Sequence, residues 1–182
     1  MRVIGLAGWS GAGKTTLVTR LIPELNRRGL SVSTLKHAHH AFDIDKPGKD
    51  SYEHRAAGAR EVLVVSANRL ALMREYRGAP EPSLAEILRL LAPVDLVLIE
   101  GFKHDAHIKV EIFRTANGKS ALNPDDPHIV GLISDLKSPP PHLPHAPIDD
   151  IRAAADLVLA HAEEINVLLR RLAGGEGRSQ LA

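Results

Sequence analysis

Short apolar runs recur along the chain, separated by stretches of helical or turn-rich pattern. Several runs are continuous rather than alternating, which is typical of strands that helices cover on both faces. The alternation of strands with helical segments favours an α/β fold around a mainly parallel sheet. The runs predict strands at residues 3–7, 32–35, 61–65, 70–73, 96–99, 110–113 and 130–133.

Apolar residues at helical spacing predict helices over residues 15–28, 83–91 and 150–172, the last as one long helix. The strands at 61–65 and 70–73 are expected to form a β-hairpin through Asn68. Residues 37–49 and 138–147 are expected to be loops. We expect a single domain over residues 1–173 and a disordered tail over residues 174–182.

Composition excludes several classes of function. The 23 Lys and Arg residues nearly balance the 22 Asp and Glu residues, so no overall field would attract nucleic acid or a membrane surface. The chain has no cysteine, which excludes disulfides, a thiolate nucleophile and a zinc–cysteine site. No apolar run is long enough to cross a bilayer, and the N-terminal run is expected to be a strand rather than a signal peptide. We therefore expect a cytoplasmic protein without nucleic-acid or membrane partners.

A phosphate-binding loop follows the first predicted strand. Residues 8–15, Gly-Trp-Ser-Gly-Ala-Gly-Lys-Thr, match the G-x-x-x-x-G-K-[ST] pattern without deviation, between an apolar strand and an amphipathic helix. Such a loop (a P-loop) turns backbone N–H groups toward a β-phosphate, its lysine reaches the β- and γ-phosphates, and its threonine hydroxyl binds Mg²⁺. The pattern predicts a P-loop NTPase-type sheet flanked by helices on both faces, with the hairpin as an insertion. The expected nucleotide-binding residues are Gly8, Ser10, Gly11, Ala12, Gly13, Lys14, Thr15 and Thr16.

A second ligand for Mg²⁺ should come from the end of a neighbouring strand. Asp95 and Glu100 flank the strand predicted at 96–99, roughly 16 Å apart at about 3.3 Å per residue. Ligands of such sheets bind at the carboxyl ends of the strands. We therefore expect Glu100 to be the acid on the metal side and Asp95 to begin the strand.

A histidine-rich segment follows the second predicted strand and contains Lys36, His37, His39 and His40, with Asp45 beyond it. The spacing leaves three roles open: transition-metal binding, contact with phosphate or substrate, and a solvated loop. Neighbours in an extended segment point to opposite sides, and Lys36 opposes a bound cation. We therefore favour γ-phosphate sensing or substrate contact over a permanent metal site.

Asp50 has two readings that the sequence does not separate. Residues 50–53, Asp-Ser-Tyr-Glu, have the spacing of a helix capping box, in which Asp50 would cap a helix. Asp50 is also placed to contact Mg²⁺ of a bound nucleotide, and both roles are compatible.

Five blocks of the sequence together resemble the B component, or adaptor protein, of molybdopterin-guanine dinucleotide biosynthesis. The blocks are residues 8–16, 36–40, 45–52, 56–59 and 98–103, and the resemblance extends over about residues 2–170. It implies a GTP-binding protein with weak GTPase activity, usually a homodimer, with GTP and Mg²⁺ as cofactors. The implied partners are the guanylyltransferase that joins GMP to molybdopterin, and molybdopterin or its guanine dinucleotide.

The choice of GTP over ATP rests mainly on this resemblance, because the Asn-Lys-x-Asp signature of many GTPases is absent. A carboxylate can accept both the N1 and N2 hydrogens of guanine, a pair that adenine does not offer. Asp135, just after the strand predicted at 130–133, is the candidate for this contact, and a turn or cap carboxylate is the alternative. No catalytic residue can be assigned.

Two other functions share a P-loop. A small-molecule kinase would need a catalytic base and an arginine-rich lid, for which the arginines between residues 55 and 77 are candidates. A nickel-insertion GTPase would combine the P-loop with histidines, but the absence of cysteine excludes a thiolate nickel site.

Overall fold

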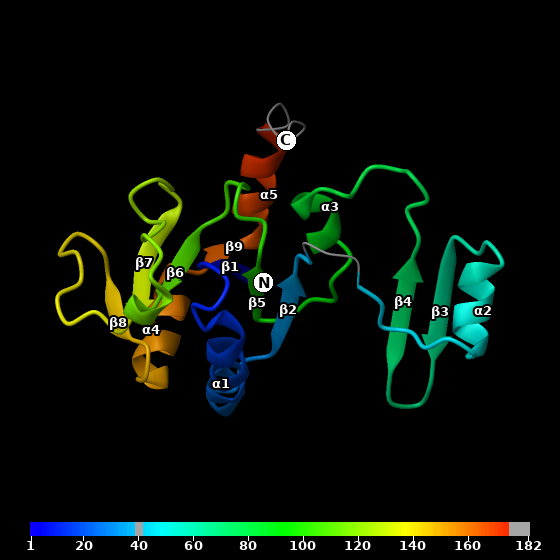
Figure 1. Cartoon of the computed structure of the whole chain (residues 1–182), viewed down its shortest axis with the longest axis horizontal. Coiled ribbons are helices and arrows are strands. Elements are labelled where there is room, and N and C mark those ends of the chain that lie inside the picture. Colours follow the sequence, from blue (N-terminus) through cyan, green and yellow to red (C-terminus); the bar gives the residue numbers. More distant parts are fainter. Residues whose placement is uncertain (39–41, 175–182) are drawn as a thin grey trace. The chain divides into compact units, whose positions relative to one another are not determined.

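The computed structural model describes residues 1–38 and 42–174 of the 182-residue chain. Its packing divides the chain into two compact units (Figure 1). The first unit comprises Met1–His37 and Leu84–Ala182, and the second comprises Ala38–Ser83. The prediction of one domain over residues 1–173 stays a prediction.

A seven-stranded sheet forms the centre of the described part of the first unit, in the order β2-β5-β1-β6-β7-β8, with β9 paired to β1. All pairs are parallel except β1 with β9. The predicted mainly parallel sheet is therefore confirmed. The strands are β1 (Arg2–Ala7), β2 (Val32–Lys36), β5 (Leu96–Glu100), β6 (Lys109–Phe113), β7 (Ile129–Ser134), β8 (His145–Pro147) and β9 (Glu163–Glu164).

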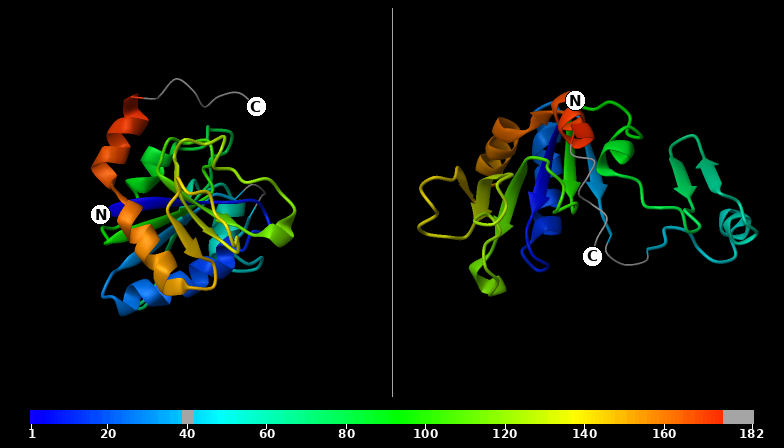
Figure 2. Two further views of the ribbon diagram at one scale, coloured as in Figure 1. Left: turned by 90° about the vertical axis from the view of Figure 1, so that its left-hand side faces the viewer. Right: turned by 90° about the horizontal axis from the view of Figure 1, so that it is seen from above.

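Helices cover both faces of this sheet (Figure 2). Alternate strand residues point to opposite faces, so even-numbered and odd-numbered residues of β1 and β5 enter different clusters. One cluster joins Ile4, Leu6, Leu96 and Leu98 to Leu17, Leu21 and Leu25 of α1 (Lys14–Arg27) and to Ala154 and Val158 of α4 (Ile151–His161). The other joins Val3, Val97 and Ile99 to Leu84 and Leu88 of α3 (Leu84–Leu88) and to Leu168 of α5 (Ile165–Gly174). Two-sided burial explains why the apolar runs are continuous.

The second unit contains the predicted hairpin. Strands β3 (Glu61–Val65) and β4 (Leu70–Arg74) pair antiparallel, and α2 (Asp50–Ala56) precedes them. The turn closes with a 2.8 Å hydrogen bond from Ser66 N to Arg69 O. Arg55 of α2 holds the ends of this unit together, because its guanidinium donates to Asp43 and to Glu75.

The predicted strands are all present, to within one residue at each end. The single helix predicted over residues 150–172 is wrong. Its apolar stripe is shared between α4 and α5, which pack on opposite faces of the sheet, and one straight helix could not cover both. The chain changes faces at Glu163–Glu164, which pair antiparallel with Arg2 and Val3 at the start of β1.

Two smaller predictions also need correction. The segment expected to be a loop over residues 138–147 ends in β8, which adds a sixth parallel strand beside β7. The helix expected over residues 83–91 is shorter, spanning Leu84–Leu88. Among the described residues, no helix has both the length and the apolar character needed to cross a bilayer.

Candidate nucleotide-binding site

The P-loop connects β1 to α1 at the carboxyl edge of the sheet. Gly8, Gly11 and Gly13 have φ angles of +148°, +83° and +92°, where other residues are strained. Gly8 is further constrained by space, since a Cβ there would lie 2.5 Å from the carbonyl oxygen of Ile112. Ser10 and Gly11 lie at the exposed turn, and Ala12 is buried against the core. The loop therefore needs glycine where the sequence has it.

The start of α1 has the properties of an anion site. Gly13 is its N-cap residue and supplies no side-chain cap, and the first turn contains no acidic residue. The first N–H groups of the helix therefore lack a side-chain acceptor, and the positive end of the helix dipole is not balanced locally. Thr15 and Thr16 are exposed in this first turn. These features favour a bound phosphate group.

Lys14 bends back over the loop that precedes it. Its Nζ donates to the carbonyl oxygens of Gly8, at 2.7 Å, and Trp9, at 3.0 Å. Burial lowers the pKa of Lys14, the charge of Glu100 opposes this shift and that of Lys36 adds to it. The ammonium group is thus held above the glycine backbone, where phosphate oxygens can replace the carbonyl oxygens as its acceptors.

Glu100 ends β5 at the same edge of the sheet. In the parallel register it lies beside Leu6 on β1 and Lys36 on β2, and its carboxylate pairs with Lys36 Nζ at 3.9 Å. Asp95 lies before the other end of the strand, where its carboxylate accepts hydrogen bonds from the backbone N–H and hydroxyl of Ser31. These two bonds lower the pKa of Asp95. Glu100 therefore lies on the P-loop side, and Asp95 joins the start of β5 to the segment before β2.

His37 lies at this edge too. Its backbone N–H donates to Glu100 O at 2.8 Å, and its ring packs on Phe102 with 4.7 Å between centroids. Gly101 makes the contact possible, because a Cβ there would lie 2.6 Å from the Cβ of His37. His39 and His40 lie outside the described residues. Within the described residues, no three His, Asp or Glu side chains are grouped to hold a metal ion.

Asp45 and Asp50 lie in the second unit. Asp45 accepts hydrogen bonds from Ser51 Oγ, at 2.9 Å, and Lys46 N, at 3.0 Å, and it pairs with Arg55. The capping-box reading of Asp50 is wrong: Lys49 is the N-cap residue of α2, Asp50 is the first helical residue, and no side chain caps the helix. Roles for Asp45 and Asp50 beside the nucleotide stay predictions.

The family follows from comparison with known proteins. A model of the MobB family, described as molybdopterin guanine dinucleotide synthesis protein B, matches residues 3–135, which include the P-loop, the histidine-rich segment and Glu100. The chain belongs to this family. The predicted resemblance is confirmed.

Individual MobB relatives agree over most of the chain. The molybdopterin-guanine dinucleotide biosynthesis adapter protein of Escherichia coli K12 is 40% identical over 172 residues, which cover 90% of this chain and 95% of that protein. The adapter protein of Haemophilus influenzae is 42% identical over 117 residues, covering 62% of this chain and 63% of that protein. The crystal structure of Bacillus subtilis MobB superposes with a TM-score of 0.68 at 28% identity, covering 90% of this chain and 99% of that one.

One wall of the site in this MobB chain was not predicted from the sequence. It is formed by residues 114–123, which follow β6 and which we call the β6 loop. A Cβ on Gly11 would lie 3.1 Å from Asn117 Oδ1, and one on Gly13 would lie 3.2 Å from Arg114 Nε. Trp9 Nε1 donates to Ser120 O at 2.8 Å, so the P-loop and the β6 loop are bonded directly.

Asp135 supports the β6 loop from the end of β7. Its Oδ1 accepts hydrogen bonds from Thr115 N, at 2.9 Å, and Thr115 Oγ1, at 2.7 Å, and these bonds lower the pKa of Asp135. Asp135 therefore has the alternative role predicted for it, that of a carboxylate that stabilises a turn. A contact with guanine stays a prediction, for which the structure supplies a fixed carboxylate on the β6 side of the P-loop.

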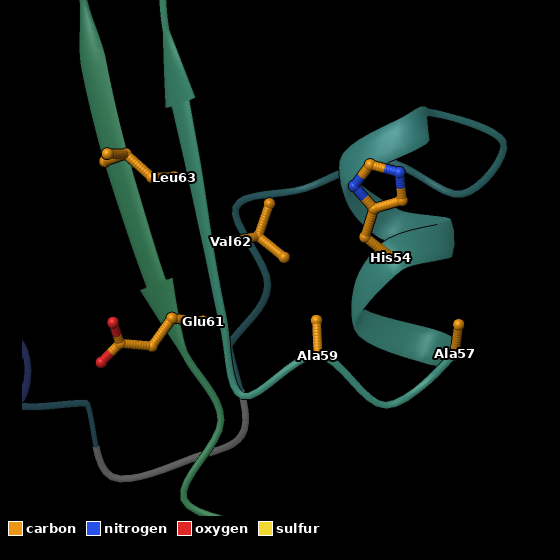
Figure 3. A pocket seen from close by; sticks show the side chains of 6 residues that line it. All are labelled: His54, Ala57, Ala59, Glu61, Val62 and Leu63. Atoms are coloured by element: carbon orange, nitrogen blue, oxygen red, sulfur yellow. The ribbon is translucent and has the colours of Figure 1, made fainter.

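The second unit has an open hollow between α2 and β3 (Figure 3). Its lining is His54, Ala57, Ala59, Glu61, Val62 and Leu63. Most of these side chains are small or apolar, and only two can bind polar groups. The hollow offers no convergent set of polar groups for a small ligand.

Proposed function

We propose that this member of the MobB family is the nucleotide-binding adaptor of molybdopterin-guanine dinucleotide biosynthesis. In this proposal it binds GTP with Mg²⁺ at residues 8–16 and assists the guanylyltransferase that joins GMP to molybdopterin. The observation that carries the proposal is the uncapped start of α1 beneath a loop of three left-handed glycines, with Lys14 above it. A cytoplasmic location and weak GTPase activity belong to the same proposal.

The residues present fit a magnesium ion beside the phosphates. Thr15 offers an exposed hydroxyl in the first turn of α1, and Glu100 offers a carboxylate whose charge acts on Lys14. Its contact with Lys36 is long, at 3.9 Å, so the carboxylate can bind a cation instead. Hard oxygen ligands of this kind suit Mg²⁺, which neutralises phosphate charge when bound. Asp50, for which the sequence leaves a contact with Mg²⁺ open, is proposed as a further ligand.

The histidine-rich segment is proposed to contact the γ-phosphate or the pterin. His37 is tied by its backbone to Glu100, and Lys36 pairs with the same residue. A phosphate or pterin bound there would meet Lys36 and His37 from the end of β2. His39, His40 and Asp45 are proposed to act with them.

We expect GTP to bind at least tenfold tighter than ATP in the presence of Mg²⁺, a difference of about 1.4 kcal/mol. The physical reason is that the Asp135 carboxylate, oriented by Thr115, can accept the N1 and N2 hydrogens of guanine. Adenine has no N–H donor at either of the corresponding positions, N1 and C2. Isothermal titration of the purified protein with each nucleotide, with and without Mg²⁺, measures the difference. Equal affinities would remove the guanine assignment and favour a small-molecule kinase.

Matched variants separate the parts of this prediction. Asp135→Asn keeps an oxygen for Thr115 but loses the charge, so it should narrow the gap between GTP and ATP. Glu100→Gln should reduce the gain in affinity that Mg²⁺ provides. Asp95→Asn, at the other end of the same strand, is its control and should leave that gain unchanged.

A homodimer is the second part of the proposal, and the hairpin supports it. Four apolar side chains lie on one face of the β3–β4 sheet, Leu63, Val65, Leu70 and Leu72, with exposed fractions between 46% and 65%. Val62, on the other face, is buried. An isolated two-stranded sheet is marginally stable, and a contiguous apolar face favours a protein interface. A second copy of the chain offers the same face.

We expect the purified protein to have about twice the 19.7 kDa mass of one chain in sedimentation equilibrium. Leu63→Lys with Leu72→Lys places two charges on a cross-strand pair of the apolar face and should shift the mass toward one chain. Glu61→Lys with Arg74→Glu, a polar pair on the same face, is the control. A single-chain mass for the wild type would contradict the homodimer.

A further inference from the structure

The β6 loop is held in a fixed position beside the P-loop by three separate side chains. Asp135 binds its start through Thr115, and Trp9 binds its middle through the carbonyl of Ser120. Its end is held by Glu111, a fully buried carboxylate on β6 that accepts hydrogen bonds from Leu122 N, Asn123 N and Asn123 Nδ2. Such a loop can place a side chain reproducibly against a ligand.

The first residue of this loop, Arg114, lies over the start of α1. A Cβ built on Gly13 would meet its Nε at 3.2 Å and its Nη2 at 4.0 Å, so the guanidinium faces the Gly13 backbone. Glycine is the residue that leaves room for it. Because Gly13 is the uncapped N-cap of α1, the guanidinium lies where the helix attracts an anion.

Cations outnumber carboxylates around the start of α1, because Lys14, Lys36 and Arg114 are set against Glu100 and Asp135. Two cations, Lys14 and Arg114, face the P-loop from different sides, and the first turn of α1 adds no carboxylate. Within residues 1–38 and 42–174, the half-buried Arg114 guanidinium makes no hydrogen bond or ion pair; its charge acts on Asp135 only at longer range. Arginine is suited to bidentate binding of phosphate oxygens.

Strand order gives the direction in which a bound nucleotide runs. Glu100 and Lys36 lie on the β5 and β2 side of β1, which is the side proposed for Mg²⁺ and the γ-phosphate. Arg114 and Asp135 lie on the β6 and β7 side, where the base is proposed to bind. A phosphate near Arg114 is therefore an inner one, between the γ-phosphate and the base.

We infer that Arg114 is a nucleotide-binding residue of this chain, and that its guanidinium binds the inner phosphates that GTP and GDP share. The inference rests on the proposed nucleotide-binding function. It adds a contact from the β6 loop to those of the P-loop, and it assigns to this loop the part of the nucleotide next to the ribose.

The test is isothermal titration of the full chain with GTP and with GDP, both with Mg²⁺. Arg114→Gln should weaken both nucleotides by similar factors of tenfold or more, with an unchanged thermal midpoint in the absence of nucleotide. Arg114→Lys keeps the charge but not the paired guanidinium donors, so it should weaken the binding of both nucleotides by a smaller factor than Arg114→Gln. Lys119→Gln removes an exposed cation of the same loop and should bind both nucleotides as the wild type does.

The outcomes distinguish this inference from the proposed function. Wild-type protein that binds neither nucleotide would overturn the proposed function and the inference with it. Wild-type binding that Arg114→Gln leaves unchanged would overturn the inference alone. A loss confined to GTP would also overturn it, since it would place Arg114 at the γ-phosphate. If Arg114→Gln does not fold, the Arg114→Lys titration decides, and equal affinity to wild type in that variant counts against the inference.

Discussion

Lys14→Ala is expected to raise the dissociation constant for GTP by about 100-fold or more while the protein stays folded. The ammonium group faces the loop carbonyls of Gly8 and Trp9 rather than the core, so its loss leaves the packing of α1 intact. In the complex it would donate to charged phosphate oxygens, and a hydrogen bond to a charged group contributes about 1.5–3 kcal/mol. Two such bonds correspond to a factor of about 100 or more in affinity. Isothermal titration of each protein with GTP measures the dissociation constant.

The control for this variant is Lys119→Ala, which removes a lysine from the neighbouring β6 loop and should retain wild-type affinity. Circular dichroism should give both variants the spectrum of the wild type. A folded Lys14→Ala protein with unchanged GTP affinity would show that the loop does not bind a triphosphate in the proposed way.

The features that depend on short stretches of sequence could be predicted. The P-loop is encoded within eight residues, and its glycines have the left-handed φ angles that the motif requires. The position of Glu100 followed from strand length and from the rule that parallel strands share one carboxyl edge. Both inferences need no knowledge of which strand lies next to which.

The β6 loop could not be predicted, because it becomes part of the site only through strand order. Residues 114–123 are about one hundred positions beyond the P-loop, and they meet it because β6 pairs with β1. The sequence would equally have allowed another strand in that place. The helix predicted over residues 150–172 failed for a related reason: its apolar stripe did not reveal that its two halves pack on opposite sheet faces. The capping-box prediction for Asp50 failed for a local reason, because Lys49 occupies the N-cap position of α2.

Buried titratable groups on β6 and before it were also missed, and one of them makes a measurable prediction. His107 is 1% exposed, and its ring lies against Gly5, where a Cβ would be 2.4 Å from Nε2. Burial, and then the charge of Lys109, lower the pKa of His107 from 6.5 to about 3. Lys109 is itself buried and pairs with Asp126 at 3.0 Å. The site therefore disfavours a second positive charge.

The free energy of unfolding is expected to fall as the pH drops from about 6.5 toward 3. The folded state holds His107 neutral with a pKa of about 3, whereas the unfolded chain protonates it near 6.5. This contribution to stability is therefore fully present above pH 6.5 and is lost below it, by up to about 1.4 kcal/mol per pH unit. Because of this group, the free energy of unfolding measured in urea should be about 2 kcal/mol lower at pH 5 than at pH 7. The Asn side chain of the His107→Asn variant does not titrate. The free energy of unfolding of this variant should therefore lack the part of the pH dependence that His107 contributes, whatever its stability at pH 7. The same pH dependence in variant and wild type would show that His107 is not the group responsible.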